Sequence, residues 1–106
     1  MPIPRKTRKR APTHPGVYIA RGLLKDYGFT QQQLADELGV SRRTVNQLVN
    51  RQRGVSADMA LRLGKLTKTS PELWLNLQTA VDLWEAKAGA GPDLAAIKPL
   101  RRTKAA

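Results

Sequence analysis

The sequence has 106 residues, with 19 Lys and Arg against 8 Asp and Glu, so its formal net charge is +11. Such an excess of positive charge in a small chain favours a polyanionic partner, and nucleic acid is the first candidate. The chain has no cysteine and one histidine, which argues against disulfides, thiol catalysis, a metal site or a cofactor. It has no apolar run of about 18 residues and no signal-peptide core, which predicts a cytoplasmic protein without a membrane partner.

Three segments are expected along the chain: a flexible basic arm over residues 1–13, a domain over residues 14–88, and a linker with a C-terminal tail over residues 89–106. The arm contains five basic residues and three prolines and has almost nothing to bury. One interpretation is an arm that follows phosphates or enters a minor groove, and the other is a solubilising tail without fixed contacts. In the tail, the apolar run over residues 93–100 predicts a strand or a turn of helix at an interface, or a frayed end.

A first helix is predicted from about His14 to Tyr27, and Gly28 is expected to end it. Pro15 suits the first helical position. His14 has no second histidine or cysteine with which to share a metal, so we expect it to cap or support the start of the helix. The apolar side chains recur at helical spacing in one stripe, with Leu23 beside it: Val17, Ala20, Leu24 and Tyr27.

Two short helices joined by a tight turn are predicted over residues 30–53. Thr30 caps the first, which covers residues 31–38 and places Leu34, Ala35 and Leu38 on one face. Gly39 suits the left-handed exit from that helix, and Ser41 caps the second helix. This spacing is typical of a helix-turn-helix motif.

The second of these helices is predicted to present polar side chains to the outside, because Val45, Leu48 and Val49 occupy its inner face. Arginine, asparagine and glutamine carry the donors and acceptors that read base edges in a major groove. The alternative is an ordinary solvated helix on an all-α domain. The predicted base-reading residues are Arg42, Arg43, Thr44, Asn46 and Gln47.

The polar loop that follows, residues 50–54, is expected to lie along the DNA backbone. Arg51 and Arg53 are natural phosphate ligands, and the alternative is plain solvated charge. Ser41 at the start of the second helix is assigned to the same backbone-contacting group, because helix N-termini bind phosphate.

Two further helices are predicted after this loop. Ser56 caps the first, whose inner face holds Met59, Ala60, Leu63 and Leu66. Ser70 and Pro71 begin the last helix, which runs to about Lys87 and is apolar over a wide arc. Such a helix can cover the domain with one side and meet a second copy with the other, although both tryptophans could instead close the monomer core. The predicted dimer interface consists of Trp74, Leu77, Val81 and Trp84.

Residues 14–87 resemble the HigA-type antitoxins, a branch of the lambda-repressor-like (XRE) family. The resemblance rests on HPGVYIARGLL, FTQQQLADELGVSRRTVNQLVNRQRGVS and MALRLGKLTKTSPELWLNLQTAVDLWEA. It implies an all-α, five-helix, dimeric protein that binds double-stranded operator DNA, represses its own operon and neutralises a HigB/RelE-like, mRNA-cleaving toxin. By position, it also implies that Gln31 and Asn50 contact the DNA backbone and that Arg42, Arg43 and Gln47 read bases.

Three alternatives to this function are considered. A stand-alone regulator of the same family would bind DNA without a toxin partner. Non-specific binding of nucleic acid through the basic tails would leave the exposed side chains of the second motif helix without a role. An enzyme is not expected, because one histidine and eight scattered acids offer no converging catalytic set.

Overall fold

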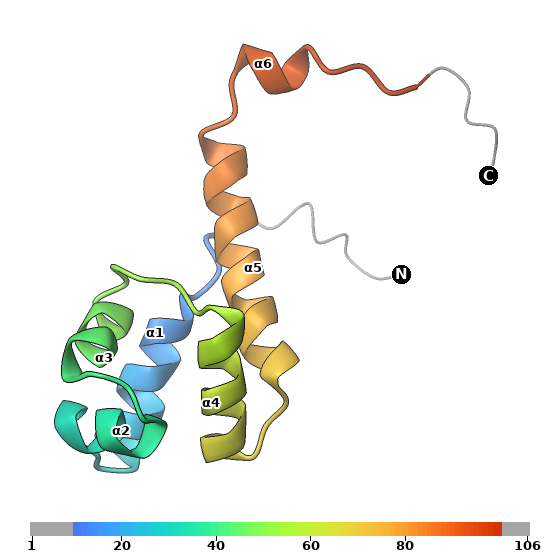
Figure 1. Cartoon of the computed structure of the whole chain (residues 1–106). Coiled ribbons are helices and arrows are strands. Elements are labelled where there is room, and N and C mark those ends of the chain that lie inside the picture. The colour runs from blue at the N-terminus through green and yellow to red at the C-terminus, as the bar shows by residue number, and fades with distance from the viewer. Residues whose placement is uncertain (1–9, 101–106) are drawn as a thin grey trace.

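The computed structural model describes residues 10–100, so most of the predicted basic arm and the end of the tail lie outside the described residues. Within this part the chain is entirely helical, which confirms the predicted all-α fold class (Figure 1). The elements in order are α1 (Pro15–Tyr18), η2 (Ile19–Asp26), α2 (Gln31–Leu38), α3 (Arg42–Val49), α4 (Ala57–Thr67), α5 (Pro71–Ala88) and α6 (Pro92–Ala95).

The first helix begins as an α-helix and continues without interruption as a π-helix, because its hydrogen bonds change register. His14 caps the start: its Nδ1 accepts a hydrogen bond from the Gly16 amide at 2.9 Å. At the other end the Tyr27 amide donates to the Gly22 carbonyl, five residues back, at 2.9 Å. Gly28 then follows with φ +90°, a left-handed conformation that glycine adopts at low cost, and the helix ends there as predicted.

The buried face of this first helix differs from the predicted stripe. Ile19 is fully buried, whereas Tyr27 is 73% exposed, and its ring lies beside the Phe29 ring with the centroids 5.0 Å apart. The prediction of Tyr27 as an inward residue is therefore wrong. A π-helical turn holds more residues than the α-helical turn from which the stripe was counted, so positions late in the helix rotate away from the core.

The other four long helices begin where capping chemistry predicts. Thr30 and Gln33 form a reciprocal capping box at the start of α2. Ser41, Ser56 and Ser70 each accept a hydrogen bond from the amide three residues ahead, at 3.1 to 3.2 Å. Each cap satisfies a helix donor that would otherwise lack a partner, so the predicted boundaries of these helices are confirmed.

A single apolar core lies where α1, η2, α2, α3, α4 and the first half of α5 meet. Its fully or nearly buried hydrophobic members are Ile19, Leu34, Ala35, Leu38, Val45, Leu48, Val55, Met59, Ala60, Leu63 and Trp74. Helices α2 and α3 pack against each other, and α4 packs chiefly against α5. The fold therefore contains two helix pairs, α2 with α3 and a supporting pair of α4 with α5, and the first helix, α1 and η2, packs against members of both pairs.

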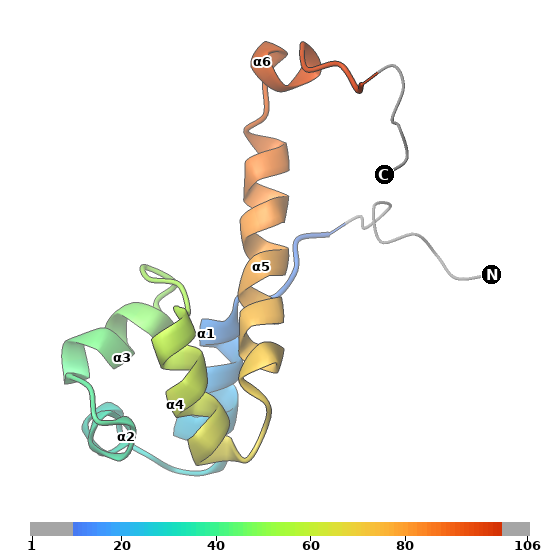
Figure 2. The same ribbon diagram turned by 45° about the vertical axis from the view of Figure 1, so that its right-hand side comes forward.

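Helix α5 continues beyond this core, and α6 lies at its far end, well away from α3 (Figures 1 and 2). Residues 85–100 are exposed throughout, and no other helix of the described chain packs against α6. For residues 93–100 the sequence predicts a strand, a turn of helix or a frayed end, and the structure contains the turn of helix, α6.

Candidate nucleic-acid interface

Helix α3 divides cleanly into a buried and an exposed face. Val45 and Leu48 are fully buried against the core, while Arg42, Arg43 and Asn46 are exposed. The Ser41 cap and the Gly39 turn, with φ +72°, orient the helix so that its first turn points outward. The predicted base-reading face is therefore polar and accessible, with the geometry that an α-helix needs to enter a major groove.

Arg42 and Arg43 are the two cations of this face, and within residues 10–100 neither has a hydrogen bond or an ion pair. The first turn of α3 contains no acidic residue, so its amide dipoles and both guanidinium groups attract anions together. A guanidinium group without an internal partner can bind guanine O6 and N7 or a phosphate without breaking a protein contact.

A ladder of side-chain amides joins α2 to α3. Asn46 donates through Nδ2 to Gln31 Oε1 at 3.2 Å and accepts at Oδ1 from Asn50 Nδ2 at 3.2 Å. The structure thus brings together one predicted base reader and two predicted backbone contacts. The ladder fixes the orientation of Asn46 and leaves one amide hydrogen of Asn50 and both amide hydrogens of Gln31 free for phosphate oxygens.

The other predicted residues also lie at this surface, and several hold one another. Arg53 donates through Nε and Nη2 to Gln47 Oε1, at 3.0 and 2.9 Å, so that Gln47 keeps only its amide donors free. Arg51 is exposed in the loop after α3 and has φ +59°. Thr44 is half-buried, and its hydroxyl is bonded to Ser41 Oγ at 3.0 Å. Thr44 and Ser41 therefore hold each other in a local capping contact at the start of α3.

His14 lies behind the loop after α3. Burial lowers the pKa of His14 below its ordinary value of 6.5, with a further lowering from the Arg51 guanidinium, and the Glu85 and Asp82 carboxylates oppose the shift. The neutral imidazole keeps Nδ1 free to accept the Gly16 amide. His14 is therefore a structural cap, as predicted from the sequence.

The dimer residues predicted on α5 fall on two different faces. Trp74 is 6% exposed and donates through Nε1 to Thr69 Oγ1 at 3.1 Å, and Val81 is equally buried in its own protomer. Leu77 and Trp84 are half-buried. They belong to a stripe that recurs at intervals of four, three and four residues along one side of α5 and is called here the α5 stripe: Leu73, Leu77, Ala80 and Trp84.

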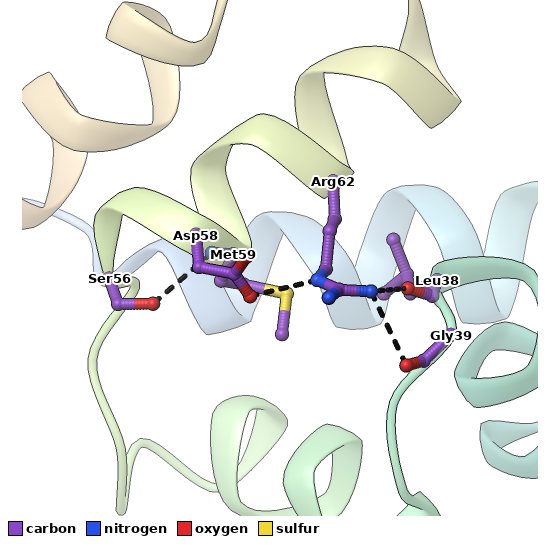
Figure 3. Close-up of polar contacts among 6 residues, drawn as sticks. All are labelled: Leu38, Gly39, Ser56, Asp58, Met59 and Arg62. Atoms are coloured by element: carbon purple, nitrogen blue, oxygen red, sulfur yellow. Dashed lines mark hydrogen bonds and ion pairs between the residues drawn. The ribbon is translucent and has the colours of Figure 1, made fainter.

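Two side chains that sequence reasoning missed join distant parts of the chain on either side of α3. Arg62 of α4 donates through Nη1 to the carbonyl oxygens of Leu38 and Gly39, at 2.8 and 3.3 Å (Figure 3). Gln78 of α5 accepts from the Val55 amide at 2.8 Å. Both side chains bond to main-chain groups more than twenty residues away, and the sequence of neither end identifies such a partner.

The described residues offer no site for a metal: no group of three or more His, Cys, Asp or Glu side chains converges within residues 10–100. None of the helices in this range is both long and apolar enough to cross a membrane.

Comparison with known proteins identifies the family of this chain. The helix-turn-helix family HTH_3 matches residues 21–74, which include α2 and α3. The chain is 38% identical over 97 residues to antitoxin HigA-1 of Vibrio cholerae, covering 91% of this chain and 90% of that protein. It is 40% identical over 82 residues to the HTH-type transcriptional regulator YbaQ of Escherichia coli, covering 77% of this chain and 73% of that one.

A solved structure of the same kind contains DNA. The Pseudomonas aeruginosa antitoxin HigA, solved with the higBA promoter, superimposes with a TM-score of 0.78 at 42% identity, over 84% of this chain and 98% of that one. The predicted resemblance to HigA-type antitoxins is thereby confirmed.

Proposed function

This chain belongs to the XRE-type helix-turn-helix family HTH_3, and we propose that within it the chain is an antitoxin that binds operator DNA in its own promoter and represses it. It is a helix-turn-helix DNA-binding regulator of the HigA type and not an enzyme. The finer proposal is that it also neutralises a HigB/RelE-like toxin that cleaves mRNA, and that it acts in the cytoplasm.

The observation that carries the DNA-binding proposal is the free polar face of α3. Arg42 and Arg43 are exposed, lack any partner in the described chain, and stand at the amino end of a helix whose other side is fully buried. Gln31, Asn50 and Arg53 border this face and can contact phosphates, which would position α3 without reading sequence. The structure of the Pseudomonas aeruginosa antitoxin HigA with the higBA promoter supports the same use of this fold.

Substitutions on α3 test base reading directly. Arg42→Ala and Arg43→Ala are each expected to weaken binding to the promoter by about 5- to 150-fold, the equivalent of ~1–3 kcal/mol per base contact. The loss should depend on individual operator bases. Lys65→Ala is the matched control, because it removes one positive charge from the last turn of α4, away from α3. Equal weakening on every duplex by all three variants would show that charge alone binds DNA.

We propose a homodimer formed through the α5 stripe. Leu73 is 44% exposed, and a groove beside it is lined by Tyr18, Leu77 and Ala80 together with residues 10–13, so this side of α5 offers partly exposed apolar surface. Helix-turn-helix proteins read paired half-sites as two-fold dimers, which makes a second copy the fitting occupant. Val81 and Trp74 would then support the interface from within the protomer.

Sedimentation equilibrium measures this dimer. Leu73→Asp is expected to shift the protein to monomer, because it places a charge in the middle of an apolar contact. Leu83→Asp is the control, since Leu83 is 55% exposed on another side of α5. Dissociation by Leu83→Asp but not by Leu73→Asp would place the interface elsewhere.

The toxin partner is tested by co-expression with the product of any neighbouring reading frame for a small RelE-like protein. Co-purification and restored growth are expected, and their failure would favour the alternative, a stand-alone XRE-type regulator; the YbaQ relative is named an HTH-type transcriptional regulator. A basic RNA-binding site on the toxin would not be blocked by an acidic mimic here, because this chain has net charge +11. Glu85→Lys should therefore leave neutralisation intact.

A further inference from the structure

Two polar contacts connect the supporting pair to the chain on either side of the recognition helix. The first, here the Arg62 contact, runs from α4 to the turn before α3. The second, here the Gln78 contact, runs from α5 to the loop after α3. Together they bracket the recognition helix α3, and each crosses between elements far apart in sequence.

The Arg62 contact closes the carboxyl end of α2. Arg62 Nη1 lies 2.8 Å from the Leu38 carbonyl oxygen and 3.3 Å from that of Gly39, groups that lack helical partners at a helix end (Figure 3). Its Nε donates to Asp58 Oδ2 at 2.8 Å, one turn back on α4, which holds the guanidinium in place. A Cβ added at Gly39 would lie 3.0 Å from Nη1, so the turn and the guanidinium are closely fitted.

The Gln78 contact has the same construction at the other end. Gln78 Oε1 accepts from the Val55 amide at 2.8 Å, and its Nε2 donates to Asp82 Oδ1 at 2.9 Å, one turn ahead on α5. A Cβ added at Gly54 would lie 2.9 Å from Gln78 Cδ. A carboxylate on the same helix thus orients each side chain, and each side chain reaches the main chain of a neighbouring turn or loop.

Between the two pairs only α2 and α4 contact each other as helices, and α3 packs against α2 and the first helix, α1 and η2. Apolar contacts are non-directional and tolerate small rotations of one helix over another, whereas hydrogen bonds weaken steeply when their angle changes. The Arg62 and Gln78 contacts join α4 and α5 directly to the chain on either side of α3, so they add directional constraints to the packing of α3 on α2 and the first helix. In a dimer formed along the α5 stripe, that orientation fixes the separation of the two recognition helices.

We propose that Arg62 and Gln78 are positioning residues that determine which half-site spacing the dimer accepts. The inference rests on the proposed function, namely operator binding by a dimer. Neither residue needs to touch DNA. Half-sites lie about one helical turn apart, and one inserted base pair moves them by about 3.4 Å, so a looser α3 would accept spacings that the native protein rejects.

The test compares the full-length dimer on three duplexes: the promoter site, the same site with one base pair inserted between its half-sites, and a single half-site. The variants are Arg62→Met and Gln78→Met, which keep much of the apolar stem and remove the polar contact. Lys65→Met is the matched control, because Lys65 is exposed on α4 and has no side-chain hydrogen bond or ion pair within residues 10–100. Arg62→Lys retains a cationic donor for the carbonyls and serves as the conservative rescue.

The expected readout is the ratio of the affinities for the native and the inserted site. Wild type and Lys65→Met should prefer the native spacing by about 10-fold or more, the size of one or two kcal/mol. Both methionine variants should reduce that preference to about 3-fold or less while binding the single half-site nearly as wild type, and Arg62→Lys should restore much of it. A purely stabilising residue would not change this ratio in folded protein.

Two results would overturn the inference, and they are distinguishable. If the methionine variants weaken both sites in parallel and keep the native ratio, Arg62 and Gln78 only stabilise the fold. If the wild-type protein binds the native and the inserted site with equal affinity, the proposed operator binding by a dimer is wrong, and this inference fails with it. Should a methionine variant unfold, Asp58→Asn and Asp82→Asn replace it, because both acids are exposed and only orient the contacts. An unchanged ratio in these variants as well would refute the positioning role.

Discussion

Replacing Gly16 by alanine should separate the first helix from the recognition helix. Gly16 is buried in α1, and a Cβ built there would overlap the main-chain carbonyl oxygen of Leu48 in α3. A flexible side chain could move aside, but this carbonyl belongs to a helix whose Leu48 side chain is fully buried. The backbones of α1 and α3 must therefore move apart to admit one methyl group.

The expected change in the free energy of unfolding of Gly16→Ala follows from two opposing effects. Alanine is favoured over glycine in a helix by about 0.5–1 kcal/mol, and overpacking a rigid site costs about 1–3 kcal/mol. Since the obstacle is backbone, we take the upper end of the cost and expect a net loss of about 2 kcal/mol. For a domain of this size that lowers Tm by roughly 8–16 °C.

Urea unfolding followed by circular dichroism measures the effect, with Gly22→Ala as the control in the same first helix. Nothing lies within 4 Å of a Cβ at Gly22, so that variant should gain about 0.5–1 kcal/mol. We therefore expect Gly16→Ala to lower the free energy of unfolding and Gly22→Ala to raise it. Equal stabilities of Gly16→Ala and Gly22→Ala would refute the close approach of α1 to α3.

Three further predictions concern single contacts. Lys68 ends α4 with φ +59°, so Lys68→Gly should relieve a left-handed strain and raise the unfolding free energy by about 0.5–1 kcal/mol in the same urea assay; a loss would show that the conformation is unstrained. The pKa of His14 is lowered in the folded state, so between that pKa and 6.5 the unfolded chain binds more protons than the folded chain. The contribution of His14 to the free energy of unfolding should therefore be complete above pH 6.5 and be lost as the pH falls through the folded-state pKa. His14→Asn, which can still cap the Gly16 amide, should remove that part of the pH dependence of Tm, and its persistence would assign the dependence to other groups. Trp74→Phe should cost about 1 kcal/mol or more through the lost bond to Thr69 Oγ1, and Thr69→Val should cost a similar amount; additive losses in the double variant would show that the two residues are not coupled.

The ends of the helices could be predicted from sequence because capping is local. Thr30 with Gln33, and Ser70 with Pro71, carry their signal within one turn of chain, and the structure places the helix starts beside them. The inner face of α3 could also be predicted, since Val45 and Leu48 keep ordinary helical spacing.

Other features depend on tertiary contacts that periodicity does not encode. The sequence predicts Trp74 at the dimer surface, but the structure buries it against the core and satisfies its Nε1 at Thr69. The π-helical register of η2 turns Tyr27 outward, against its predicted inward position. The partners of Arg62 and Gln78 are main-chain atoms, which have no sequence signature.

The central claim is that α3 reads a specific operator. The most direct measurement is a titration of the purified protein, over a series of salt concentrations, against its own promoter duplex and an unrelated duplex of equal length. If α3 reads a specific operator, the promoter duplex should bind about 10³-fold more tightly than the unrelated duplex at near-physiological salt. Equal binding of both duplexes, falling steeply together as salt rises, would contradict it and leave the net charge of +11 as the sole source of affinity.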